Sequence, residues 1–244
     1  MNKLDRKNIK DDSANFALQR RHCIALALAL GVSGACGLAA SSAHAAKHKE
    51  ASKPAAPTPA GPVLVLGDSL SAEYGLNRGK GWVHLLQQRM EAEKIHRKVI
   101  NASISGDTTA GGKSRLPALL KQHQPAVVVL ELGGNDALRG LALQSTQSNL
   151  QSMIKMAKEA QAQVLLVGMQ VPPNYGAAYT EQFADMFKNI ATEQSLPLVP
   201  FLLSGIGDAP DAEQWFQADR IHPNAKAQPH MLGNVWPKIK PMLK

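Results

Sequence analysis

Short apolar runs recur along the chain after residue 60, and each ends in glycine, proline or a polar residue. Such runs are typical of strands that are buried on both faces of a parallel sheet. The run at 126–132 is the clearest, because its three valines are β-branched and favour strands. We therefore predict five strands, at Val63–Leu66, Lys98–Asn101, Ala126–Leu132, Val164–Val167 and, more weakly, Leu198–Pro200.

Between these runs, apolar residues recur at intervals of three and four positions, as they do on the buried face of a helix. This spacing predicts helices marked by Trp82, Leu86 and Met90, by Leu116 and Leu120, by residues 150–160, and by Phe183, Phe187 and Ile190. Residues 224–243 are also helical by pattern, but Pro229, Pro237 and Pro241 predict a kink. Strand and helix alternate, so we predict a three-layer α/β/α domain with a parallel sheet of about five strands.

The first 45 residues break this pattern. Residues 1–21 hold six basic and three acidic side chains, residues 23–43 are uncharged, and Ala43-His44-Ala45 places small residues before a cleavage site. This order is that of a secretory signal peptide, which predicts cleavage after Ala45 and a periplasmic or secreted protein. A retained membrane anchor is the alternative, although glycines and serines dilute the apolar run. Lipoprotein anchoring at Cys36 and twin-arginine export through Arg20-Arg21 are further alternatives.

Composition then limits the class of protein. Residues 46–60, rich in Ala, Pro and Lys, form a predicted linker, which leaves residues 61–244 as one domain. The net charge of +8 suggests nucleic-acid binding, but residues 1–60 carry nine basic and four acidic side chains. No basic run with interleaved aromatic residues remains in the domain, so a nucleic-acid partner is not predicted. Both cysteines, Cys23 and Cys36, precede the domain, which therefore has no thiol nucleophile.

Residues able to carry out acyl transfer follow the predicted strands, at the edge where parallel α/β sheets bind ligands. Ser69, in Gly67-Asp68-Ser69-Leu70, could attack a carbonyl once a base takes its proton, or could simply cap a helix. His222 follows Asp219 by three residues, so the carboxylate can hold the imidazole. The alternative is a loop histidine beside a solvated aspartate. As a base, His222 would accept the Ser69 proton and pass it to the leaving group.

Acyl transfer also needs hydrogen-bond donors for the oxyanion that develops on the carbonyl. Gly106 follows the second predicted strand and can present its backbone N–H without a side chain in the way. Asn135, in Gly133-Gly134-Asn135-Asp136 after the third strand, can present its side-chain amide. Ordinary turn chemistry is the alternative for each segment.

These four segments, in this order, resemble the SGNH (GDSL) hydrolase superfamily. The segments GDSLSAEYGL, NASISGDTTAGG, RLPALLKQHQP, ELGGNDALRG, VPPNYG and DRIHPNAKAQP are similar to one bacterial branch of it. That branch is variously called acyl-CoA thioesterase I, arylesterase, lysophospholipase or protease I. The resemblance covers residues 61–244 and implies a flavodoxin-like fold that needs no metal and no cofactor.

The resemblance implies a role for each matching residue. Ser69 is the nucleophile and also gives its backbone N–H to the oxyanion. Gly106 gives a second backbone N–H, and Asn135 gives a side-chain donor. His222 is the base and Asp219 is its partner.

Other polar residues beside the motifs receive different interpretations. Asp68 is expected to brace the turn, while Asp107 and Asp136 are turn residues because neither has a histidine nearby in sequence. Glu73 and Arg220 stand where relatives often have glycine. The Glu73 carboxylate would either disfavour anionic substrates or lie solvated on the first turn of a helix, and Arg220 would contact solvent or substrate.

The predicted function is that of an exported serine esterase and thioesterase acting on aryl esters, acyl thioesters or lysophospholipids. Its partner would be this small-molecule substrate, whose apolar acyl group would lie along the loops after the third and fourth strands. The candidate lining residues there are Leu138, Leu141, Val171 and Tyr175. A polysaccharide O-acetyl esterase of the same superfamily and a non-catalytic binding module on this fold are the alternatives. Nothing in the sequence indicates the oligomeric state.

Two other patterns are not interpreted as sites. The segment 106–114 resembles a phosphate loop, but Asp107 stands where the first glycine of G-x-x-x-x-G-K-S must be. The histidines outside the motif lack metal-ligand spacing and are expected at or near the surface, and two tryptophans are expected in the core. These are His84, His96, His123, His230, Trp82 and Trp236.

Overall fold

The computed structural model describes residues 61–244. The predicted signal peptide (1–45), its cleavage site after Ala45, the lipoprotein site at Cys36 and the linker (46–60) lie outside the described residues, and these assignments stay predictions. Within residues 61–244, no helix is both long enough and apolar enough to cross a membrane.

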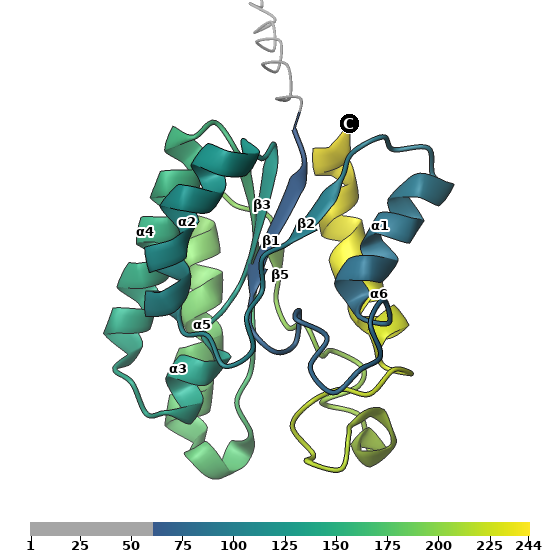
Figure 1. The fold of residues 1–244 in the computed structure, drawn as a ribbon. Helices are drawn as coiled ribbons and strands as arrows, with labels where there is room; N and C mark the ends of the chain where they lie inside the picture. The colour runs from purple at the N-terminus through teal and green to yellow at the C-terminus, as the bar shows by residue number, and fades with distance from the viewer. Residues whose placement is uncertain (1–60) are drawn as a thin grey trace, which may run out of the picture. The chain divides into compact units, whose positions relative to one another are not determined.

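Five parallel strands form a single sheet, which confirms the predicted number and direction (Figure 1). Every residue of the neighbouring strands β1 and β3 is buried, and all of them are apolar or glycine except Glu131 at the end of β3. The strand order, β2-β1-β3-β4-β5, is that of flavodoxin-like folds, in which ligands bind where the order reverses, between β1 and β3. The strands are β1 (Val63–Gly67), β2 (Val99–Asn101), β3 (Val127–Glu131), β4 (Gln163–Val167) and β5 (Leu198–Val199).

Helices cover both faces of this sheet, so the predicted three-layer α/β/α architecture is confirmed (Figure 1). Helices α1 and α6 lie on one face, and α2, α4 and α5 lie on the other (Figure 1). The apolar positions that predicted the helices are buried, including Trp82 in α1 and Phe187 in α5. The helices are α1 (Trp82–Ala92), α2 (Thr109–His123), α3 (Gly134–Leu138), α4 (Leu143–Glu159), α5 (Ala177–Gln194) and α6 (Gln228–Ile239). Three short 3₁₀ helices complete the set: η1 (Pro173–Tyr175), η2 (Ala212–Trp215) and η3 (Lys240–Leu243).

The C-terminal helix begins four residues later than the sequence predicts. The Asn224 side chain donates hydrogen bonds to the backbone oxygens of Gln214 and Phe216, which holds residue 224 in the loop before α6. Pro229 therefore falls in the first turn of α6, where a proline has no helical N–H bond to lose. The predicted kink at Pro229 is therefore wrong, because this proline is the second residue of α6.

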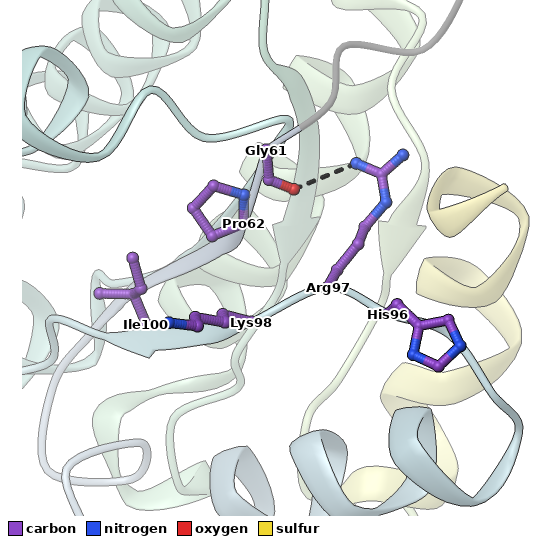
Figure 2. Close-up of a pocket in the computed structure, with 6 residues that line it drawn as sticks. All are labelled: Gly61, Pro62, His96, Arg97, Lys98 and Ile100. Carbon is purple, nitrogen blue, oxygen red and sulfur yellow. Dashed lines mark hydrogen bonds between the residues drawn. The ribbon is translucent and has the colours of Figure 1, made fainter.

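A hollow of about 360 Å³ lies at the amino ends of β1 and β2 (Figure 2). Inside it, the Arg97 guanidinium donates a 3.2 Å hydrogen bond to the Gly61 carbonyl oxygen (Figure 2). Ser69 follows the opposite, carboxyl end of β1, so this hollow is separate from the predicted catalytic residues. Its lining residues are Gly61, Pro62, His96, Arg97, Lys98 and Ile100.

Candidate active site

Ser69, His222 and Asp219 come together at the carboxyl edge of the sheet. The Ser69 Oγ lies 2.9 Å from Nε2 of His222, and the His222 Nδ1 lies 2.7 Å from Oδ2 of Asp219. Ser69 occupies the turn after β1, whereas Asp219 and His222 share one turn of the loop before α6. When Nδ1–H donates to the carboxylate, Nε2 carries no proton and can accept one from the Ser69 hydroxyl.

Backbone hydrogen bonds keep the Asp219 carboxylate in its charged form. Its Oδ1 accepts the N–H groups of Ile221 and His222, each at 3.0 Å. The hydrogen bond from the His222 N–H is the main reason why the pKa of Asp219 falls to about 2. The carboxylate is therefore charged near neutral pH, where it can hold the imidazole and stabilise its protonated form.

The three predicted oxyanion donors also follow β1, β2 and β3. Within residues 61–244, the backbone N–H groups of Ser69 and Gly106 donate no hydrogen bond. Gly106 has φ +77°, a conformation that favours glycine. The Asn135 Nδ2 donates to Oδ2 of Asp68 at 3.0 Å, which uses one of its two N–H bonds. Each of the three residues can thus offer one donor to a bound oxyanion.

Charged side chains fix the loop that carries Gly106. The Arg139 Nη2 donates a 2.7 Å hydrogen bond to the Gly106 carbonyl oxygen, and Asp107 forms a 2.6 Å ion pair with Arg115. Asp136 is buried and accepts two hydrogen bonds from the first residue of α2. Asp107 therefore holds its own loop, as predicted. Asp136, expected as a turn residue, lies instead in α3 and joins that helix to the start of α2.

Two buried carboxyl groups lie near Ser69 in the structure. Asp68 accepts the Leu70 N–H at 3.1 Å and so braces the turn, as predicted, while Oε2 of Glu131 accepts the Ser71 hydroxyl at 2.7 Å. Burial raises the pKa of Asp68 to about 6, against the lowering effect of hydrogen bonds from Leu70 and Asn135. Burial and the neighbouring Asp68 charge raise the pKa of Glu131 well above its usual value.

Glu73 and Arg220 share an unusual backbone conformation. Their φ angles are +61° and +58°, in the left-handed region where glycine is favoured. The Glu73 carboxylate accepts the N–H groups of Gly79 at 3.0 Å and Gly81 at 2.8 Å. The interpretation of Glu73 as a first-turn helical residue is wrong, because α1 begins only at Trp82 and the side chain ties down the preceding loop. Arg220 is exposed, and its guanidinium lies 3.5 Å from an exposed carboxylate, Glu213.

Exposed apolar side chains gather around this edge. In residues 61–244, the large exposed hydrophobic side chains stand in the segments that follow β1, β2, β3 and β4, except Ile221, which stands directly before His222. Three were predicted as acyl-lining residues, whereas the fourth predicted residue, Val171, is only 5% exposed and offers little surface to a substrate. The exposed residues are Tyr74, Ile104, Leu138, Leu141, Tyr175 and Ile221.

Sequence reasoning missed Tyr74, although it stands only five residues after Ser69. Its ring centroid lies 4.3 Å from that of His222, with 40° between the ring planes. Its position in the GDSLSAEYGL segment, directly before a glycine, was the available signal, because a loop aromatic next to a nucleophile has no core position to explain it.

The remaining predictions concern residues other than Ser69, Asp219, His222 and their neighbours. Trp82 and Trp236 belong to the core, as predicted, and His84, His96 and His230 are exposed. Among the described residues, no group of three or more His, Cys, Asp or Glu is placed to hold a metal ion. The absence of a required cofactor stays a prediction of the resemblance.

Comparison with known proteins supports the same family. Residues 65–228 match the GDSL-like Lipase/Acylhydrolase family. The chain is 52% identical over 181 residues to Esterase TesA of Pseudomonas aeruginosa, which covers 74% of this chain and 89% of that protein. It is 42% identical over 181 residues to Thioesterase 1/protease 1/lysophospholipase L1 of Escherichia coli K12, covering 74% of this chain and 84% of the relative.

A solved structure agrees with these sequence matches. The psychrotrophic esterase EstA from Pseudoalteromonas sp., inhibited by monoethylphosphonate, superposes with a TM-score of 0.70 at 40% identity. The match covers 75% of this chain and 98% of that structure. The chain therefore belongs to the GDSL-like lipase/acylhydrolase family, as its four motifs predicted, and is a hydrolase that acts on esters.

Proposed function

We propose that this protein is an exported serine esterase and thioesterase that works through an acyl-enzyme on Ser69. The observation that carries this proposal is the continuous series of contacts from Ser69 Oγ to His222 Nε2, at 2.9 Å, and from His222 Nδ1 to Asp219 Oδ2, at 2.7 Å. Serine needs such a base to become a nucleophile, and the base needs a partner that fixes its tautomer.

In the first half of the reaction, Ser69 Oγ attacks the carbonyl carbon of the ester while its proton moves to Nε2 of His222. The resulting oxyanion accepts hydrogen bonds from the backbone N–H groups of Ser69 and Gly106 and from the Asn135 amide. The bond to the leaving oxygen or sulfur then breaks, and Nε2 gives its proton to that atom. The products are a free alcohol or thiol and an ester on Ser69.

In the second half, water attacks the Ser69 ester and gives a proton to Nε2. Collapse of the second oxyanion breaks the bond to Ser69 Oγ, which regains its proton from His222. The products are a carboxylic acid and the free enzyme, so no cofactor enters the balance.

The proposed substrates are aryl esters, acyl thioesters and lysophospholipids. The names of the relatives, an esterase and a thioesterase/lysophospholipase, support these classes. The exposed side chains of Leu138, Leu141 and Tyr175 offer an apolar surface for an acyl chain beyond β3 and β4. This surface favours longer acyl groups over the acetyl groups that a polysaccharide O-acetyl esterase would remove.

Export is proposed from the sequence of residues 1–45, which has the basic, apolar and A-x-A order of a signal peptide. Cleavage after Ala45 would release the domain to the periplasm or the medium. N-terminal sequencing of the protein recovered from a periplasmic extract tests this part, because a retained Met1 would contradict it.

The catalytic proposal is tested with p-nitrophenyl esters and the full chain. We expect Ser69→Ala to lower kcat by about 10⁴- to 10⁶-fold, as removal of a nucleophile does. Ser145→Ala is the matched control, because Ser145 is exposed on α4, and it should keep wild-type activity. More than about 1% of wild-type kcat in Ser69→Ala would contradict the assignment of the nucleophile.

A further inference from the structure

The nucleophile has different surroundings on the two faces of the sheet. Tyr74 and His222 lie in the loops that lead into α1 and α6, and these two helices cover the same face (Figure 1). Leu138 ends α3 and Tyr175 ends η1, and these short helices precede α4 and α5, which lie on the other face (Figure 1). The acyl-lining residues proposed above therefore come from other segments than those that carry Tyr74 and His222.

Tyr74 is held in place beside the catalytic base although its side chain is 49% exposed. Gln217 donates from Nε2 to the Tyr74 carbonyl oxygen at 2.8 Å and to the Pro223 carbonyl oxygen at 3.1 Å. The Gln217 backbone N–H also donates to the His222 carbonyl oxygen at 2.8 Å. One side chain thus fastens the Tyr74 loop to the His222 loop.

The residue after Tyr74, Gly75, lies in close contact with the Gln217 side chain. Gly75 has φ +68°, and a Cβ added to it would lie 1.9 Å from Oε1 of Gln217. Glycine is favoured by this backbone conformation, and any larger residue would have to displace the Gln217 side chain. The Tyr74 backbone is held at this place, and its half-exposed ring offers an apolar surface whose centroid lies 4.3 Å from that of the imidazole.

The chemistry decides which part of a substrate meets this surface. If the proposed function holds, on which this inference rests, His222 Nε2 must deliver its proton to the leaving oxygen as the bond to the carbonyl carbon breaks. The leaving oxygen must then lie within hydrogen-bond reach of Nε2, and the group attached to it must pass next to the side chains that flank His222. The acyl chain, on the opposite side of the carbonyl carbon, points away from them.

We propose that Tyr74 is a specificity-determining residue that contacts the leaving group, and that it favours aryl leaving groups over small alkyl ones. A phenyl ring packed on a tyrosine gains the attraction of an aromatic pair, which is worth about 2- to 12-fold in an equilibrium or rate. An ethyl group offers no aromatic face and gains less.

This role has a kinetic signature. The leaving group departs before water enters, so it can affect only the formation of the acyl-enzyme. Esters of one acid form the same acyl-enzyme, so its hydrolysis has the same rate whichever ester was used. Replacement of Tyr74 can therefore change the preference between such esters only in the first half-reaction. The contact with the leaving group is therefore visible in kcat/KM ratios between esters of one acid.

The test uses four substrates and the full chain: the phenyl and ethyl esters of butanoic and octanoic acid. We expect Tyr74→Ala to lower the phenyl-to-ethyl ratio of kcat/KM by about 2- to 12-fold for both acids. The octanoyl-to-butanoyl ratio should stay at the wild-type value. Tyr74→Phe keeps the ring and should keep both wild-type ratios. Tyr175→Ala is the matched control, which should change the octanoyl-to-butanoyl ratio and leave the phenyl-to-ethyl ratio unchanged.

These ratios do not depend on the fraction of folded enzyme, so a less stable variant still gives an answer. An equal decrease for all four esters in Tyr74→Ala would overturn the proposal, because it would show only a disturbance of His222. A changed chain-length ratio would overturn it as well. Failure of the proposed function looks different, since Ser69→Ala would then hydrolyse the same four esters.

Discussion

Replacement of Asp68 by asparagine should change how the stability of the domain depends on pH. Asp68 is 3% exposed, and burial raises its pKa from 3.8 to about 6. The folded protein therefore holds this proton more tightly than the unfolded chain does. The resulting contribution to the free energy of unfolding is fully present below pH 3.8 and is lost as the pH rises through about 6.

The size of this contribution follows from the shift. A difference of about 2 pKa units corresponds to about 3 kcal/mol, of which roughly 2 to 3 kcal/mol is lost between pH 4 and pH 7. Asparagine has no proton to exchange in this range. The free energy of unfolding of Asp68→Asn therefore lacks this loss. The difference between variant and wild type (variant minus wild type) should rise by about 2 to 3 kcal/mol from pH 4 to pH 7. Loss of the charge beside Glu131 acts in the same direction, because Asp68 helps to raise the pKa of Glu131.

The assay is equilibrium unfolding of the full chain in urea at several pH values between 4 and 7, followed by tryptophan fluorescence. The matched control is Asp208→Asn, because Asp208 is an exposed aspartate that accepts only the Gly205 N–H. The control should follow the wild-type pH dependence. If Asp68→Asn also runs parallel to wild type, then Asp68 has no raised pKa and the buried carboxyl pair is not an energetic feature of the site.

Three further changes test the parts of the site separately. Asn135→Ala should lower kcat on p-nitrophenyl esters by about 10²- to 10³-fold with little change in KM, since it removes one oxyanion donor; a wild-type kcat would contradict that role. Asp219→Asn should lower kcat at pH 7 by about 10²- to 10⁴-fold, because the amide can favour the wrong imidazole tautomer, and unchanged kinetics would exclude Asp219 as the partner of His222. Arg220→Gly should raise the free energy of unfolding by about 0.5 to 1 kcal/mol in urea titrations, because φ is +58° and the contact with Glu213 is solvent-exposed. Arg220→Lys is its control and should change nothing.

The sheet and most of its helices could be predicted because their signals are local. The residues of β1 and β3 are apolar or glycine except for Glu131 at the end of β3, and this apolar sequence fits the burial of both strands. Helix α3 has five residues, two of them Gly134 and Asn135, and so it has neither the length nor the composition that predicts a helix. The start of α6 was misplaced because the hydrogen bonds that hold Asn224 reach back to Gln214 and Phe216.

The residues of the site also fall into those that local motifs predict and those that they do not. The residues of the resemblance, such as Ser69 and His222, stand in short recurring motifs, and the predicted contact between them is present at 2.9 Å. The neighbours that shape their surroundings come from distant segments. Tyr74 contacts His222 across two loops that are about 140 residues apart in sequence and that Gln217 joins by a hydrogen bond. Glu131 lies in an apolar run that predicts an ordinary strand, and its carboxyl group is buried where it accepts a hydrogen bond from Ser71, 60 residues away in sequence.

The central claim is that Ser69 forms a covalent acyl-enzyme, and covalent labelling tests it most directly. The full chain is treated with an ethyl phosphonate ester, and the modified peptide is identified by mass spectrometry. We expect one adduct per chain, located on Ser69, together with loss of esterase activity in proportion to labelling. Ser69→Ala should carry no adduct. Inactivation without an adduct on Ser69, or labelling of Ser69 with full retention of activity, would contradict the account.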